Sequence, residues 1–127
     1  MNKSDYLAVK QLNNALRGIA YTPPGTLYIG LFTTTPTSAG GGVEVATGAY
    51  TRQAATFAAP SSNQCLSIGS INFTTPTLDW GNLVGAALFD DPTAGNMLYF
   101  GDLVTPRIVY AGDPVFFPAG YFAITES

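Results

Sequence analysis

Residues 83–89, with the sequence Leu-Val-Gly-Ala-Ala-Leu-Phe, form the most apolar stretch of the chain. Apolar side chains occupy both sets of alternating positions in this stretch, so an extended segment here has two apolar faces. A strand of this kind is typical of the centre of a buried sheet. Residues 90–96 are dense in turn formers, and the apolar residues 97–101 after them are predicted to return as the antiparallel partner strand.

The same alternation with a period of two recurs outward from this stretch, in short segments separated by Gly, Pro and Asp. These further predicted strands are residues 27–32, 50–57, 66–73, 108–110, 115–117 and 121–125. We therefore predict a mainly β fold: an antiparallel β-sandwich or jelly-roll-like domain of about seven to eight strands.

The N-terminal residues follow a helical period instead. Ser4 is the predicted N-cap, and Gly18 and Pro23 end the pattern. The apolar positions at helical spacing are Ala8, Leu12, Ala15, Leu16 and Ile19. We predict one amphipathic helix whose apolar stripe packs on its own sheet or on a neighbouring subunit. We interpret residues 1–127 as a single domain, with residues 1–20 as an N-terminal helix or arm and residues 25–127 as the β-sandwich body.

Several classes of chemistry lack their residues in this chain. None of the 127 residues is a histidine, which excludes Ser-His-Asp and Cys-His catalysis. Cys65 is the only cysteine, so an intrachain disulfide and a thiolate zinc site are also excluded. Asp90 and Asp91, together with Asp102 or Asn96, are the candidate ligands of a calcium ion, but their spacing matches no calcium motif. All the aspartates from Asp79 to Asp113 are interpreted as turn residues, and we expect no enzymatic activity, no metal and no cofactor.

Charge is scarce and unevenly placed. Only 10% of the residues are charged, against about 25% in an average globular protein, and we infer that partner proteins cover part of the surface. After residue 17 the chain carries Arg52 and Arg107 against seven acids, which argues against nucleic-acid binding. No signal peptide or membrane span is evident in the sequence, so we expect no membrane partner and synthesis in a cytoplasm.

Short motifs in both halves of the chain form a familiar series. In order they are Leu16-Arg17-Gly18, Tyr21-Thr22-Pro23, Tyr28, Leu31-Phe32-Thr33-Thr34, Gly40-Gly41-Gly42 with Glu44-Val45, Gly48-Ala49-Tyr50-Thr51-Arg52-Gln53, Phe57, Trp80-Gly81, Phe89-Asp90, Gly95-Asn96-Met97-Leu98-Tyr99, Gly101, Gly112-Asp113 and Gly120. This series resembles a family of small tailed-bacteriophage virion proteins that are commonly labelled phage tail fibre proteins. The resemblance implies a non-enzymatic structural protein that is assembled in the host cytoplasm and resides in the virion.

Three roles are compatible with that resemblance or with the composition. The chain has no repetitive shaft and no coiled-coil trimerisation segment, so we favour a capsid cement or decoration protein that contacts the major capsid protein. The first alternative is a tail fibre or a tail or head appendage subunit that contacts tail proteins. The second is a host-surface carbohydrate-binding module that uses the abundant Tyr and Phe side chains. We expect a homo-oligomer, with a trimer favoured.

The candidate protein-contact residues lie in the N-terminal segment, the glycine-rich loop and the segment that follows it. They are Lys3, Lys10, Arg17, Gly40, Gly41, Gly42, Glu44, Tyr50 and Arg52. Arg52 has two interpretations, since arginine is enriched at contact hot spots but also forms ion pairs within a chain. It is either an interface anchor or the partner of Glu44 in an intramolecular salt bridge.

Overall fold

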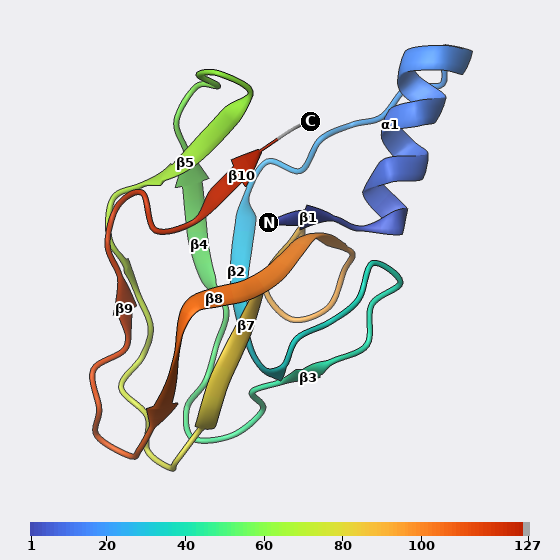
Figure 1. The fold of residues 1–127 in the computed structure, drawn as a ribbon. Coiled ribbons are helices and arrows are strands. Elements are labelled where there is room, and N and C mark those ends of the chain that lie inside the picture. Colours follow the sequence, from blue (N-terminus) through green and yellow to red (C-terminus); the bar gives the residue numbers. More distant parts are fainter. Residues whose placement is uncertain (126–127) are drawn as a thin grey trace.

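The structure is a computed structural model that describes residues 1–125, and it is mainly β with one helix (Figure 1). The helix is α1 (Asp5–Arg17). The strands are β1 (Asn2–Lys3), β2 (Leu27–Thr34), β3 (Val43–Glu44), β4 (Gln53–Phe57), β5 (Gln64–Ile68), β6 (Ile71–Asn72), β7 (Gly81–Phe89), β8 (Met97–Val109), β9 (Phe116–Phe117) and β10 (Ala123–Thr125).

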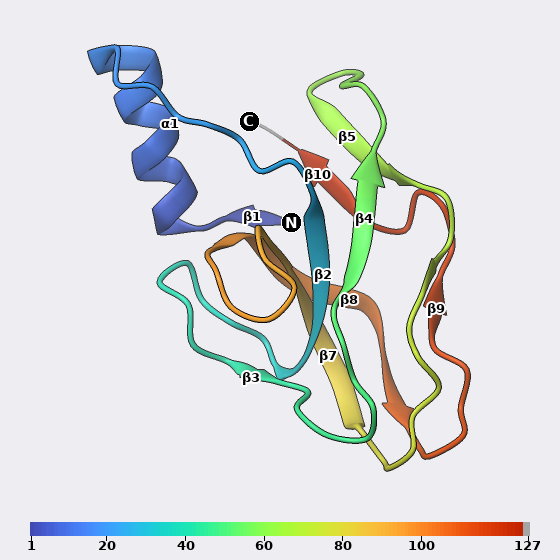
Figure 2. The same cartoon turned by 180° about the vertical axis from the view of Figure 1, so that it is seen from behind.

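Eight of these strands form one antiparallel sheet that curls almost into a barrel (Figure 2). The order along the sheet is β1-β8-β7-β2-β4-β5-β10, and β3 pairs with β2 off this path. The amino group of Met1 donates a hydrogen bond to the carbonyl of Ala123 at 2.9 Å, so the two outer strands meet across the seam. Strands β6 and β9 form a separate antiparallel pair. The mainly β, antiparallel fold predicted from the sequence is confirmed.

The predicted central strand is β7, which lies between β2 and β8 and is buried on both faces. On one face Leu88 stands opposite Ile29 of β2, and both side chains are fully buried in the main core. On the other face Ala87 and Phe89 join Phe32 in a second, smaller cluster. Double-sided burial explains why the alternation of residues 83–89 is apolar in both phases.

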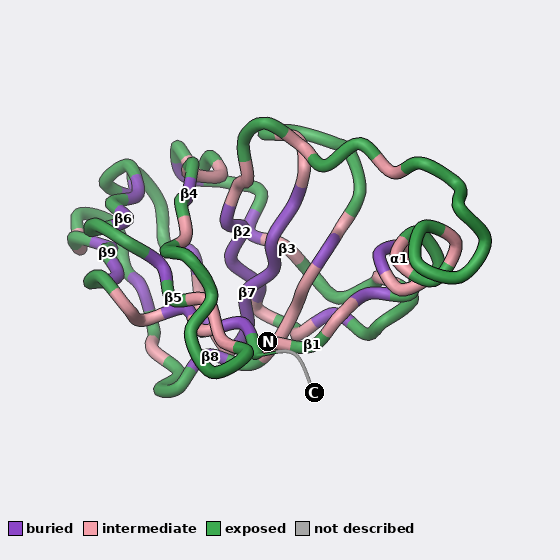
Figure 3. Tube along the Cα trace, turned by 90° about the horizontal axis from the view of Figure 1, so that it is seen from above, coloured by how far each residue is buried: buried purple, intermediate pink, exposed green. Residues whose placement is uncertain are grey.

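Helix α1 forms where predicted, but it buries a different side. The Ser4 hydroxyl accepts a hydrogen bond from the Leu7 backbone N–H at 3.2 Å, and Gly18 ends the helix in the left-handed conformation with φ of 66°. Leu7 is the buried residue of the helix, whereas Leu12 and Leu16 are 58% and 78% exposed. Of the two expected partners of the apolar stripe, the chain's own sheet is not the one it contacts, because the helix stands beside the body with its outer side exposed (Figure 3). Packing of the stripe on a neighbouring subunit stays a prediction.

The N-terminal arm and the segment after the glycine-rich loop, neither of which was predicted as a strand, each add a short strand to the sheet. Asn2 and Lys3 pair with Phe100 and Tyr99 as strand β1, and β3 extends the glycine-rich loop onto β2. The N-terminal arm is therefore attached to the body at its first residues, and only the helix projects from it (Figure 1).

Two strand predictions also needed correction. Residues 97–101 and 108–110 were predicted as separate strands with Asp102 in a turn between them, but they belong mainly to one long strand, β8, which also contains Pro106. Proline is tolerated because the register with β7 shifts between the pairs Gly85–Asp102 and Leu83–Arg107, which leaves extra β8 residues outside the ladder. Conversely, residues 66–73 divide into β5 and β6 at Gly69, whose φ is 71°.

Candidate functional site

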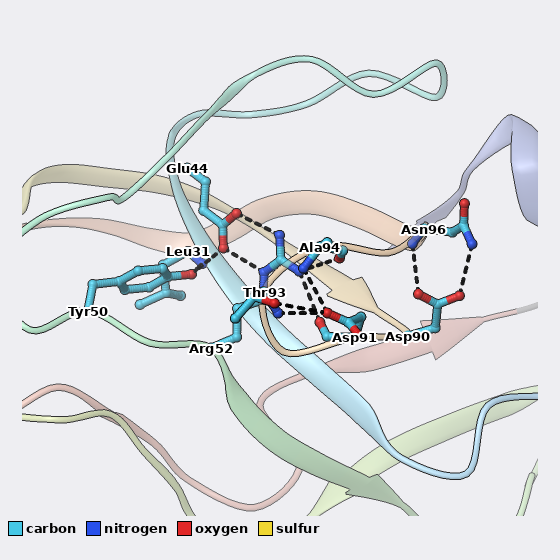
Figure 4. A network of polar contacts seen from close by, with 9 residues as sticks. All are labelled: Leu31, Glu44, Tyr50, Arg52, Asp90, Asp91, Thr93, Ala94 and Asn96. Atoms are coloured by element: carbon cyan, nitrogen blue, oxygen red, sulfur yellow. Dashed lines mark hydrogen bonds and ion pairs between the residues drawn. The ribbon is translucent and has the colours of Figure 1, made fainter.

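A connected cluster of polar side chains is built around Arg52, which immediately precedes β4 (Figure 4). Its Nε and Nη2 donate to the two carboxylate oxygens of Glu44 on β3, each at 2.8 Å. The exposed fraction of the Arg52 side chain is 8% and that of Glu44 is 23%. Of the two interpretations of Arg52, the intramolecular salt bridge with Glu44 is the one that the structure contains.

Arg52 also holds the loop between β7 and β8. Its Nη1 donates to the backbone carbonyls of Asp91 at 3.0 Å and Ala94 at 2.8 Å. The guanidinium lies over the ring of Phe89, 3.5 Å from the ring centroid. Four of the five guanidinium N–H groups are thus engaged within the chain, so Arg52 acts as a clamp between two loops.

Tyr50 completes the cluster from the core side. Its hydroxyl donates to Glu44 Oε2 at 2.6 Å and accepts from the backbone N–H of Leu31 at 2.9 Å. Its ring packs edge-on against Trp80, with 5.4 Å between the ring centroids. Gly30 leaves the space that the Glu44 carboxylate occupies, since a Cβ at this position would lie 2.6 Å from Oε2.

The surroundings of this cluster shift two pKa values. Burial, then the hydrogen bond and the negative charge of Glu44, raise the pKa of Tyr50 far above its ordinary value. Burial acts to lower the pKa of Arg52, but the hydrogen bonds and charge of Glu44 outweigh it and raise that pKa overall. Both shifts keep Tyr50 neutral and Arg52 charged, which are the protonation states that the hydrogen bonds require.

The loop that Arg52 holds is also organised by its own aspartates. Asp91 Oδ2 accepts from the backbone N–H groups of Thr93 at 3.0 Å and Ala94 at 2.8 Å. These hydrogen bonds lower the pKa of Asp91. Asp90 accepts from the Asn96 backbone at 2.7 Å and from its side chain at 3.1 Å. The predicted turn roles of Asp90 and Asp91 are confirmed.

One of the other aspartates also serves its own turn, and two do not. Asp113 accepts from the backbone of Tyr110 at 2.9 Å, three residues earlier, whereas Asp79 accepts from the backbone of Ala111 at 2.8 Å, 32 residues later in the chain. Asp102 instead lies within β8 and accepts from the Thr35 hydroxyl at 2.6 Å, so the predicted turn at this position is wrong.

Two hollows border the cluster. One, of about 300 Å³, is lined by Glu44, Tyr50, Arg52 and Thr93 among others. The second, of about 350 Å³, lies between the start of α1, the glycine-rich loop and the loop that precedes β8. Its floor includes Phe32 and Phe89, which are 4% and 8% exposed and therefore belong to the core.

The chemistry of this region is that of a structural clamp. Among residues 1–125 no group of three or more acidic, histidine or cysteine side chains converges as metal ligands would. Every buried side-chain nitrogen or oxygen in the same part of the chain has a hydrogen-bond partner. The described residues also contain no helix with the length and hydropathy that a bilayer span requires.

The structure brings together only some of the predicted contact residues. Glu44, Tyr50 and Arg52 form one cluster, while Gly40, Gly41 and Gly42 follow strand β2 in a loop in which all three have positive φ. Lys3 lies in β1, and Lys10 and Arg17 lie on α1. Phe89 and the carbonyls of Asp91 and Ala94 were not predicted as partners of Arg52, since a backbone acceptor about 40 residues away leaves no signal in a sequence pattern.

A comparison with known protein families matches this chain. The family model described as Gp80, podophage GP4 fiber I protein gp80, matches residues 2–125. No curated protein matches the chain.

Proposed function

Because this chain belongs to the Gp80 family of podophage fiber I proteins, we propose that it is a structural subunit of a tail fibre or a related appendage of a bacteriophage particle. The observation that carries the proposal is the family match, which extends over nearly the whole chain. The match supports the fibre alternative of the sequence analysis better than the capsid cement role that we favoured there.

The architecture suits a part that works by contact and rigidity. The nearly closed sheet leaves few free strand edges, and Arg52 ties the loop that precedes β8 to β3. The same scaffold holds α1 beside the body with its apolar side outward, available to other virion proteins. No step of catalysis is needed for this role, and we propose a non-enzymatic protein located in the virion.

The capsid cement role remains a distinct hypothesis with a distinct position on the particle. A cement subunit binds at the seams of the shell, so it is distributed over the whole head. A fibre or appendage subunit is confined to the tail or to the vertex that carries it.

Immunogold labelling of intact particles tests the proposal. We expect gold particles at the tail or its appendages, in numbers small compared with the capsomers. Label spread evenly over the head would overturn the fibre assignment in favour of cement, and particles without any label would overturn both. A serum raised against an unrelated protein gives the background.

A further inference from the structure

The larger of the two hollows lies between the start of α1, the glycine-rich loop and the loop that precedes β8, and it is here called the α1 hollow (Figure 2). Its volume is about 350 Å³. Small-molecule sites occupy about 300–1,000 Å³, so the α1 hollow is large enough for one small ring. In the smaller hollow, the side chains of Glu44, Tyr50, Arg52 and Thr93 are already committed to contacts within the chain.

Backbone hydrogen bonds tie together the segments that surround the α1 hollow. The Asp5 N–H donates to the Ser38 carbonyl at 2.8 Å, which joins the start of the helix to the glycine-rich loop. The Ser4 N–H donates to the Leu98 carbonyl at 2.9 Å, which joins the helix to β8. The hollow is therefore formed before any ligand arrives, and binding costs little ordering of the protein.

The floor of the α1 hollow is apolar. Phe32, Phe89 and Met97 line it, and all three belong to or pack against the smaller core cluster. Tyr6 of α1 adds a half-buried aromatic ring to the lining. A ligand with an apolar face can rest on such a surface.

The polar groups left available at the rim are acceptors of hydrogen bonds. The Asp5 carboxylate is exposed, and no side-chain hydrogen bond or ion pair within residues 1–125 engages it. The Asn96 amide nitrogen donates to the Asp90 carboxylate at 3.1 Å, so the amide oxygen points away from that carboxylate and can accept. The Ser38 hydroxyl can accept or donate. A ligand that suits this rim carries several hydrogen-bond donors.

An anionic ligand is disfavoured at this rim. The Asp5 carboxylate would repel it, and backbone N–H groups at the start of α1 are already engaged. The Leu7 N–H donates to the Ser4 hydroxyl at 3.2 Å, and the Ala8 N–H donates to the Ser4 carbonyl at 3.0 Å. With the Asp5 N–H bound to Ser38, the helix N-terminus has few donors left for an anion.

A cationic ligand is disfavoured as well. The Arg52 guanidinium lies 3.5 Å from the centroid of the Phe89 ring, and the Lys10 amino group lies 5.6 Å from the centroid of the Tyr6 ring. Both rings thus already have a cation over them, and their attraction for a second one is reduced. The exposed carboxylate of Asp5 attracts a cation only weakly in water. What fits the lining is a neutral molecule with several donors and one apolar face.

From this lining we infer that the α1 hollow binds a neutral sugar ring. The hydroxyl groups of a pyranose are donors for Asp5 and Asn96, and its C–H face is an apolar surface for the aromatic rings. The source of the sugar rests on the proposed fibre or appendage function: it is a polysaccharide on the surface of the host cell.

An NMR titration of the ¹⁵N-labelled full chain tests the inference. The probes are glucose, galactose, mannose, rhamnose and N-acetylglucosamine, with glucuronate and glucosamine as charged counterparts. For at least one neutral sugar we expect saturable shifts of the amide signals of Asp5, Ser38, Gly41, Gly95 and Asn96. The Kd should be about 1–10 mM, since few hydrogen bonds and one small apolar face contribute.

The charged sugars decide the class of ligand. Glucuronate and glucosamine should bind at least about tenfold more weakly than the best neutral sugar. Tighter binding of either charged sugar would overturn the inference. So would the absence of saturable shifts at these amides for every neutral sugar of the panel.

Two variants alter the α1 hollow without touching the core. Asp5→Asn replaces the charged acceptor by a neutral one, and Ala39→Leu adds bulk from an exposed position of the lining. Each should weaken binding of the neutral sugar at least about fivefold, because charged acceptors make the stronger hydrogen bonds and the added side chain fills the hollow.

Matched variants at the other end of the molecule control for charge and bulk. Asp79→Asn keeps an oxygen that accepts from Ala111, and Ala119→Leu enlarges an exposed turn residue. Both should bind the sugar as the wild type does, and thermal melting checks that every variant is folded. Wild-type binding by the two hollow variants, or equal losses in the controls, would overturn the assignment of the site.

The outcome is separable from that of the labelling experiment. Gold on the tail without sugar-induced shifts leaves the fibre assignment intact and removes the sugar site. Gold over the whole head with saturable shifts at the α1 hollow overturns the fibre assignment and the host-surface source, but supports the sugar site itself.

Discussion

Arg52 shows how much one residue can organise when its whole fork of donors is used. The guanidinium spans Glu44 on β3 and the carbonyls of Asp91 and Ala94 in the next hairpin loop. A lysine has no planar fork and cannot reproduce this bidentate geometry. The cluster therefore depends on arginine specifically, as well as on a positive charge.

Replacing Arg52 by methionine should lower the free energy of unfolding by about 2–4 kcal/mol, because Glu44 and two loop carbonyls lose their partner in a largely buried place. Urea unfolding measures the change. Arg17→Met removes an exposed arginine of α1 and should change the free energy by less than about 0.5 kcal/mol. Equal losses of unfolding free energy in the two variants would show that the buried contacts of Arg52 stabilise the fold no more than an exposed arginine does.

Gly30→Ala tests the space behind the Glu44 carboxylate. The new Cβ would lie 2.6 Å from Glu44 Oε2 and 3.1 Å from the Tyr50 hydroxyl, so the cluster must shift. We expect a loss of about 1–3 kcal/mol in unfolding free energy. Gly25→Ala is the matched control, since no heavy atom lies within 4 Å of its added Cβ. A Gly30 variant as stable as the Gly25 variant would contradict the proposed packing.

The pKa of Tyr50 is raised in the folded state, which gives a pH dependence of known sign. Its stabilising contribution is fully present below the unfolded pKa of about 10 and is lost as the pH rises through the folded pKa. The melting temperature should therefore fall above about pH 10. The fall should be shallower in a Tyr50→Phe variant, which is less stable at neutral pH because Glu44 and Leu31 each lose a hydrogen bond. Parallel melting curves of the two proteins above pH 10 would refute this assignment.

At the scale of elements, the sequence was informative where burial is periodic and misleading where tertiary contacts override local signals. The central strand β7 was predictable because it is apolar in both phases. The limits of α1 were predictable from Ser4 and Gly18, but its buried side was not, because the body accepts Leu7 and leaves the stronger stripe outside. A contact between Leu7 and the body decides which side of α1 is buried, and the amphipathic pattern of the helix alone does not predict it.

Strand β8 illustrates the opposite error. Asp102 was predicted to lie in a turn, yet it lies within one continuous strand that also contains Pro106. The register shift against β7 removes the hydrogen-bonding requirement that a proline cannot meet.

In the polar cluster, the Glu44–Arg52 ion pair could be predicted from opposite charges that lie near each other in the chain. The contact of Arg52 with the carbonyl of Asp91 could not be predicted in this way.

The cap of α1 gives a test at this scale. Ser4 is 2% exposed, and its hydroxyl accepts from the Leu7 backbone, so Ser4→Ala should lower the unfolding free energy by about 1 kcal/mol. Far-UV circular dichroism during urea unfolding records the change. Ser70→Ala, at an exposed position between β5 and β6, should leave the unfolding curve unchanged. An unaltered curve for the Ser4 variant as well would show that the cap does not stabilise the helix.

At the scale of the whole molecule, stability is unevenly distributed. The hairpin of β7 and β8 together with β2 contains the most deeply buried side chains, whereas α1 contributes a single buried residue. We expect native-state hydrogen exchange to find the β7 amides among the slowest and the middle of α1 opening at a much lower free energy. Protection of α1 equal to that of β7 would mean that the helix and the body unfold as one unit.

The separation of charge along the molecule has a last consequence. The helical end carries Lys10 and Arg17, while the acids near the tip of β8 contribute to a net charge of −3. The chain is therefore an electric dipole as well as an anion. Near a strongly negative surface, the electric field of that surface exerts a torque on the dipole and turns the helical end toward the surface before any contact is made. Orientation is thus set at a distance, by long-range forces that fade as ionic strength rises.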